Sequence, residues 1–210
     1  MTDLPPWDSE DKARQRTSWT RRGADEVVFR NPWITVETCA VTAPTGYPAT
    51  YGVVRMANLA IGVLPLFDDG TVAMVGQSRF ALGNYSWEMP EGGAPMDEDP
   101  LDGAKRELRE ETGLEATHYE EILRMELSNS VTDERAICYL ATGLTQGETE
   151  PDPTEAIEHA RVPFRDVLAA IEKGQIRDAL TVATVLRVYH MAVEGHLPPH
   201  LRDAILAPPL

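Results

Sequence analysis

Short runs of apolar residues, and stretches in which apolar and polar residues alternate, dominate the first part of the chain, and both patterns indicate β-strands. Asp68, Asp69 and Gly70 separate two of these runs, which predicts a tight hairpin turn. A loop rich in proline and acidic residues follows the last runs. The expected strands lie at 27–30, 33–41, 49–54, 59–67, 71–77, 122–127 and 136–142, and the loop lies at 147–157.

The pattern becomes helical after Asp99, which can cap a helix whose first position is a proline. Apolar residues recur at helical spacing over Leu101–Leu108, and Gly113 can end the helix in a left-handed turn. We therefore expect a helix over residues 100–112. Two more helices are expected, from Pro163 to about Gly174 and over 181–195, before a proline-rich tail.

Strands mixed with helices at these spacings predict an α/β fold, with a mixed sheet between helical layers. The residues before about 25 are polar and are expected to be loose. We divide the chain into an N-terminal arm of antiparallel strands, 1–57, and a catalytic domain, 58–210.

The composition suits one globular domain with a small extension, because 42% of the 210 residues are hydrophobic. No apolar run approaches the roughly 18 residues of a membrane span, so we expect a cytoplasmic protein. Cys39 and Cys138 lie in apolar segments and are expected to be buried thiols. The net charge of −15 opposes binding to nucleic acid and to anionic membranes.

Three carboxylates crowd one side of the expected helix, because Glu107 and Glu111 are one turn apart and Glu110 lies beside them. A solvated, salt-bridged helix face would explain them. A magnesium ion would also explain them, since it takes carboxylate oxygens and leaves positions for water and phosphate. Gly92 and the glycine after it would let the backbone approach such an ion closely.

This stretch resembles the Nudix box: a glycine, five residues, a glutamate, seven residues, and then the pattern Arg-Glu-aliphatic-any-Glu-Glu-any-Gly-aliphatic. Every defined position is filled, from Gly92 to Leu114. The resemblance implies a Nudix-type α/β/α sandwich with a mixed sheet. It also implies divalent cations and hydrolysis of nucleoside diphosphates linked to another group.

Within that family the chain is similar to ADP-ribose pyrophosphatases and nucleoside-diphosphate-sugar hydrolases over residues 25–190. The segments that carry this similarity are 59–67 leading into 75–80, 87–92, 151–157 and 171–179. The early strands are similar to the segment that builds the dimer in those enzymes, which implies a homodimer.

By the same resemblance, Glu107 and Glu111 bind metal and the backbone carbonyl of Glu91 assists. Glu155 is implied as a further ligand or as the general base, which is useful because the attacking water must lose a proton. The expected cofactor is Mg²⁺, with Mn²⁺ as its substitute. The residues that would brace the box are Gly92, Glu98, Arg106 and Gly113.

The identity of the base stays open, because other acids lie near these positions in the sequence. Glu110 on the helix and Glu134, next to Asp133, are the alternative catalytic residues. Glu155 ranks first, although a solvated loop acid would also account for it. Its loop holds further acids, Glu148, Glu150, Asp152 and Glu158.

Arg79 is a candidate phosphate ligand because its guanidinium offers paired donors, although an arginine at a strand end also suits a surface ion pair. Trp33 and Trp87, and Tyr85 beside the latter, would stack on a base or a sugar, or else belong to the core. The five histidines have no metal-ligand spacing and receive no role.

We predict a broad substrate class and not ADP-ribose alone. Many ADP-ribose pyrophosphatases carry a proline in the segment that is Ser128–Glu134 here, and this chain has none there. We therefore expect hydrolysis of ADP-ribose or a nucleoside diphosphate sugar to a nucleoside monophosphate and a sugar phosphate. The alternatives are a hydrolase of dinucleoside polyphosphates or capped RNA, and a non-catalytic nucleotide-sugar sensor.

Overall fold

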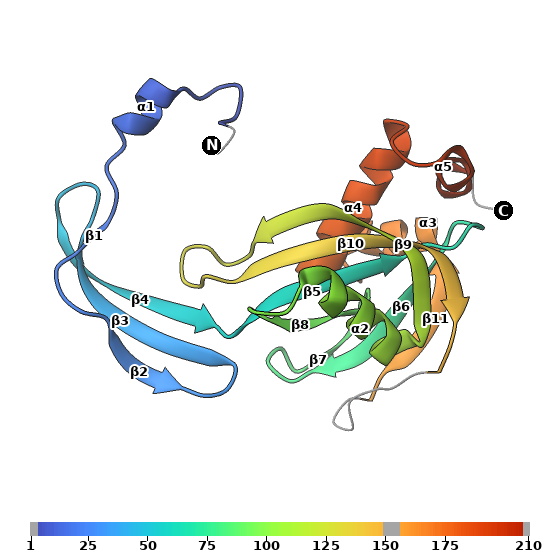
Figure 1. Ribbon diagram of the computed structural model, residues 1–210, viewed down its shortest axis with the longest axis horizontal. Helices are drawn as coiled ribbons and strands as arrows, with labels where there is room; N and C mark the ends of the chain where they lie inside the picture. The colour runs from blue at the N-terminus through green and yellow to red at the C-terminus, as the bar shows by residue number, and fades with distance from the viewer. Residues whose placement is uncertain (1–3, 149–155, 208–210) are drawn as a thin grey trace. The chain divides into compact units, whose positions relative to one another are not determined.

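The computed structural model describes residues 4–148 and 156–207. The chain forms two compact units, of which the first holds Met1–Ala57 together with Ser128–Asp133 and the second holds Asn58–Leu127 and Glu134–Leu210. Figure 1 shows the strands of the first unit in blue and cyan. None of the helices within residues 4–148 and 156–207 has the length and apolar character of a membrane span.

The first unit is an antiparallel sheet around a central strand, β3 (Ile34–Thr42). Strand β4 (Pro48–Met56) pairs along one edge of β3, and β1 (Thr20–Arg21) and β2 (Glu26–Arg30) pair along the other. The expectation of a loose start before residue 25 was wrong for α1 (Glu10–Arg14) and β1. The Ser9 hydroxyl caps α1 by accepting from the Lys12 amide at 3.3 Å.

The second unit contains a mixed sheet in the order β8-β5-β10-β9, which confirms the predicted mixed sheet. Strand β10 runs parallel to β5, and the other pairings are antiparallel. A three-stranded antiparallel sheet, β11-β6-β7, completes the strands. The bounds are β5 (Asn58–Pro65), β6 (Thr71–Arg79), β7 (Asn84–Glu88), β8 (Glu91–Pro95), β9 (Leu114–Glu126), β10 (Arg135–Gln146) and β11 (Glu158–Pro163).

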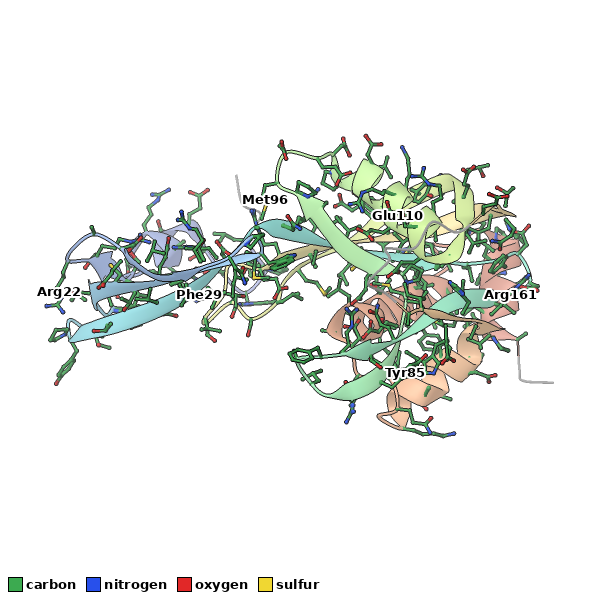
Figure 2. All side chains as sticks on the ribbon, turned by 90° about the horizontal axis from the view of Figure 1, so that it is seen from below. Arg22, Phe29, Tyr85, Met96, Glu110 and Arg161 are labelled. Carbon is green, nitrogen blue, oxygen red and sulfur yellow. The ribbon has the colours of Figure 1, made fainter. Side chains whose placement is uncertain are left out.

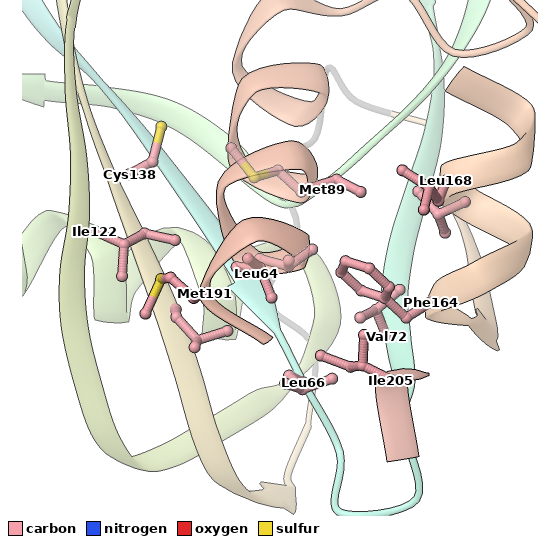
Figure 3. Packing of buried hydrophobic residues seen from close by; sticks show 14 of the residues in the cluster. Leu64, Leu66, Val72, Met89, Ile122, Cys138, Phe164, Leu168, Met191 and Ile205 are labelled. Atoms are coloured by element: carbon pink, nitrogen blue, oxygen red, sulfur yellow. The ribbon is translucent and has the colours of Figure 1, made fainter. Parts of the chain in front are cut away.

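Helices cover both faces of the mixed sheet because β5 is apolar on both faces. Ile61 and Val63 pack with Leu108 of α2 (Pro100–Thr112) in one buried cluster. Leu64, on the other face of β5, belongs to a larger cluster with α3 (Phe164–Glu172), α4 (Ala179–Val193) and α5 (Pro199–Leu206). Figure 3 shows this larger cluster, with Leu64 beside Met191 and Phe164.

The helix over 100–112 is confirmed, and the two later helices lie close to their expected positions. The proline-rich tail contains a helix that was not predicted, α5. Its proline is at the first helical position, where no amide is needed, and Leu201 and Ile205 are buried one turn apart. The cysteines are free and buried, as predicted.

The glycine that ends α2 has a left-handed backbone conformation whose importance can be tested by substitution. Gly113 has φ +68°, and a Cβ there would lie 2.9 Å from the Gly147 carbonyl oxygen. Gly174, after α3, has φ +67° but open space around it. We expect Gly174→Ala to lower the free energy of unfolding by about 1 kcal/mol through strain alone, and Gly113→Ala by about 2–3 kcal/mol through strain plus the clash. Urea denaturation measures both, and equal losses would contradict the predicted clash.

Candidate active site

Helix α2 directs two of its acidic side chains, Glu107 and Glu111, toward strand β8. Its start is fixed by Asp99, whose Oδ1 accepts from the Leu101 amide at 2.8 Å. Glu107 and Glu111 are only 8% and 3% exposed. A purely solvated helix face is therefore wrong for these two residues, because such a face would leave its carboxylates in water.

Strand β8 accommodates the carboxylates through a missing side chain and a backbone donor. A Cβ on Gly92 would lie 2.3 Å from the carboxyl carbon of Glu107, so only glycine leaves room for this carboxylate. The amide of Glu91 donates to Oε2 of Glu111 at 3.0 Å. The backbone of β8 and the carboxylates of α2 are thus in direct contact.

Arg106 holds the acidic groups of the box together. Its guanidinium donates to Glu107 Oε1 at 2.7 Å and to Glu110 Oε2 at 3.1 Å. It also donates to Glu98 Oε2 at 3.2 Å and to the Gly93 carbonyl at 3.0 Å. The hydrogen bonds that Arg106 donates to Glu98, and then the one to Glu107, raise the pKa of Arg106, so the guanidinium stays charged.

A second acidic group lies beside the first. Glu88 of β7, Glu91 of β8 and Asp178 at the start of α4 place ligand atoms within 4.8 Å of one another. Arg79 at the end of β6 donates through its Nε to both oxygens of Glu88, at 3.1 and 3.0 Å. A terminal nitrogen of Arg79 also donates to Glu91 Oε1 at 2.9 Å.

Burial and neighbouring charges both oppose the ionised form of Glu91. Its Oε2 is buried and accepts no hydrogen bond within the described residues. Burial, followed by the charges of Asp178 and Glu88, raises its pKa well above the ordinary value, and Arg79 opposes this only in part. A buried carboxylate oxygen without a donor, next to two more carboxylates, fits a divalent cation, because hard cations take oxygen ligands.

The residues predicted as the general base lie in three different parts of the chain. Glu110 is partly exposed on α2 and is labelled in Figure 2. The main-chain carbonyl of Glu134 accepts from the Leu127 amide at 3.1 Å. Its neighbour Asp133 belongs to the first unit, where it pairs with Arg55 at 3.3 Å. Glu155 lies outside the described residues.

The two tryptophans have different surroundings. Trp87 packs partly buried against the larger apolar cluster and meets the ring of Tyr85 edge-on, with the ring centres 6.0 Å apart. This is the core position considered as the alternative to stacking. Trp33 lies in the first unit and is 66% exposed.

Sequence reasoning missed three residues that the structure brings to this region. Glu88 and Asp178 were not singled out, although both lie in segments that carry the family resemblance. His159, which received no role, contacts the main chain of Glu111 at the end of α2. Only the tertiary arrangement reveals that contact, because the residues are 48 positions apart.

The family model described as NUDIX domain matches residues 56–184. The chain belongs to the Nudix family. An ADP-ribose pyrophosphatase of Mycobacterium tuberculosis is 32% identical over 147 residues, which cover 69% of this chain and 70% of that protein.

A second relative is an ADP-ribose pyrophosphatase of Bacillus subtilis, 30% identical over 77% of this chain and 88% of its own length. A crystal structure of an ADP compounds hydrolase superimposes with a TM-score of 0.77 at 20% sequence identity, covering 87% of this chain and 99% of the other. The superposition confirms the predicted Nudix-type α/β fold.

The raised pKa of Glu91 gives a pH prediction for the metal-free protein. Between the unfolded and the folded pKa, the native state holds a proton that the unfolded state has released, so stability falls as pH rises. Glu91→Gln removes the titration. We expect urea unfolding in chelator to show Glu91→Gln gaining stability over the wild type as pH rises from about 5 to 8. A difference that does not change with pH would contradict this.

Proposed function

We propose that this chain hydrolyses the pyrophosphate bond of ADP-ribose or of a nucleoside diphosphate sugar, releasing a nucleoside monophosphate and a sugar phosphate. The observation that carries the proposal is the burial of Glu107 and Glu111 against the glycine backbone of β8 in an intact box. The names of two relatives that align over more than two thirds of the chain support the substrate class.

The proposed cofactor is Mg²⁺, with Mn²⁺ as its substitute. Glu107, Glu111 and the carbonyl of Glu91 would hold it together with Glu155, since all four offer the hard oxygen atoms that magnesium prefers. Bound magnesium would lower the pKa of a water and screen the negative charge of the pyrophosphate. Arg106 keeps its own contacts to Glu107, so it limits the positions that this carboxylate can adopt.

The general base is proposed to be Glu155, with Glu110 and Glu134 as the alternatives. Glu110 is already bound to the charged guanidinium of Arg106, at 3.1 Å. Because Arg106 already holds the Glu110 carboxylate, we rank Glu110 below Glu155.

Arg79 is the proposed phosphate ligand of the substrate. In the structure it is the counter-ion of Glu88 and Glu91, and its side chain remains 36% exposed. A phosphate would therefore bind on its open side or compete with these carboxylates for its donors. Stacking on the base or the sugar is proposed for Trp33, which is exposed, rather than for Trp87, whose ring packs against the core.

The test of the substrate class is a panel of ADP-ribose, ADP-glucose, GDP-mannose and diadenosine polyphosphates, assayed with magnesium and again with excess chelator. We expect turnover of ADP-ribose or a nucleotide sugar that stops with chelator. Turnover confined to the diadenosine compounds would replace the substrate class, and full turnover in chelator would refute the metal requirement.

The box carboxylates are tested by Glu107→Gln and Glu111→Gln. If they hold the cation, the turnover number should fall by about a hundredfold, equivalent to about 3 kcal/mol of transition-state stabilisation. The matched control is Glu115→Gln, at an exposed glutamate of β9, which should retain wild-type turnover. Near-native rates of both box variants at saturating magnesium would exclude α2 as the catalytic centre.

We also propose that the chain forms a homodimer through its first unit. Strand β2 exposes apolar side chains that a monomer would leave in water, with Val28 58% and Phe29 52% exposed. Phe29 is labelled in Figure 2. Burial of such a strand against a second copy would remove this surface from water and stabilise the pair.

The dimer is tested by light scattering of Val28→Asp combined with Phe29→Asp. We expect the wild type at twice the chain mass of 23.2 kDa and the double variant at the chain mass, because two buried charges disrupt an apolar contact. Leu186→Asp, at an exposed apolar site of α4, serves as the control and should remain dimeric. A wild type that is monomeric at micromolar concentration would refute the proposal.

A further inference from the structure

The C-terminal end of α2 is capped by residues of two strands. An α-helix leaves its last carbonyl groups without partners inside the helix. Here the Gln146 side chain at the end of β10 donates its Nε2 to the Thr112 carbonyl at 3.0 Å. The Gly147 amide donates to the next carbonyl, that of Gly113, at 2.7 Å.

The carbonyl that precedes these two, on Glu111, is bound by His159 of β11. A carbonyl oxygen can only accept, so the Nε2 of His159 must carry the hydrogen. Strand β11 is itself fixed to β6, where His159 is opposite Val75 in the antiparallel register. The ring thus connects a paired strand with the last turn of α2.

Glu111 is consequently held at both its main chain and its side chain. Its carbonyl accepts from His159, and its carboxylate accepts from the amide of Glu91 in β8. Two strands on different sheets therefore determine where this residue lies. Removing a group that holds a metal ligand in place commonly weakens metal binding by about 10–100-fold.

We propose that His159 is a positioning residue, which acts through the backbone of Glu111 to fix the carboxylate that binds the cation. The proposal rests on the proposed function for the role of Glu111, and on the hydrogen bonds of β8 and β11 for the geometry. Gln146 acts at the neighbouring carbonyl of Thr112 and limits how far the last turn can move.

The test compares His159→Leu, which removes the donor, with His159→Gln, which keeps an Nε2 donor at a similar reach. His118→Leu, at an exposed histidine of β9, is the matched control. The first measurement uses metal-free protein and follows hydrogen exchange at the Gly113 and Gly147 amides. We expect exchange several-fold faster in His159→Leu, and wild-type exchange in the Gln variant and the control.

The second measurement is Mn²⁺ binding by electron paramagnetic resonance, and the third is the Mg²⁺ dependence of ADP-ribose hydrolysis. We expect the Mn²⁺ dissociation constant and the Mg²⁺ concentration for half-maximal rate to rise about tenfold in His159→Leu. The KM for ADP-ribose should change by less than about twofold, because the proposed role acts on a metal ligand and not on substrate binding. His159→Gln should restore both metal constants.

The outcomes separate this proposal from the proposed function. Unchanged exchange in His159→Leu would overturn the connection itself, and faster exchange with unchanged Mn²⁺ affinity would reduce His159 to a helix cap and overturn the positioning role. Equal losses in the Leu and Gln variants would also overturn it. A wild type that binds Mn²⁺ but hydrolyses none of the panel would refute the proposed function, while the exchange and binding measurements would still decide the role of His159.

Discussion

The packing of the acidic face of α2 on the glycine backbone of β8 is the constraint on which the rest of the site depends. Burying ionised carboxylates is costly unless donors or cations compensate. Glu107 is compensated by Arg106, and Glu111 by the amide of Glu91. A divalent cation would add to this compensation, because hard cations take carboxylate oxygens as ligands. Any side chain at position 92 would fill the space that the Glu107 carboxylate occupies.

The apolar core makes that arrangement rigid. Ile61 and Val63 on one face of β5 lie in the cluster that receives Leu108 of α2, and Leu64 on the other face lies in the cluster beneath α4. Because β8 pairs with β5, the strand that carries Gly92 is fixed to the same element that anchors α2. Well-packed cores resist small displacements, so the acidic groups are held together although they repel one another.

Local signals explain why α2 was predicted with its observed bounds, whereas β8 was not expected. The cap at Asp99, the apolar spacing and the terminating Gly113 all act within a few residues. Strand β8 contains adjacent glycines, which argue against a strand. It forms because it pairs with β5, where Gly92 is opposite Ile61. The first half of β9, Leu114–Glu120, is mostly polar and has no apolar run, so its pairing with β10 was likewise not predicted.

The site residues likewise divide into those that local sequence signals predict and those that only the tertiary fold brings together. The box carboxylates follow from spacing on one helix, but Glu88, Asp178 and Arg79 converge from different elements. Asp178 looks in sequence like a helix cap, which it is, since its Oδ2 accepts from the Thr181 amide at 2.7 Å. Its proximity to Glu91 is a tertiary property, and it makes Arg79 the main counter-charge of three acids in the metal-free protein. Under the proposed function, a phosphate that draws Arg79 away would leave these acids less compensated and would strengthen their attraction for a cation, so phosphate and cation would each favour the binding of the other.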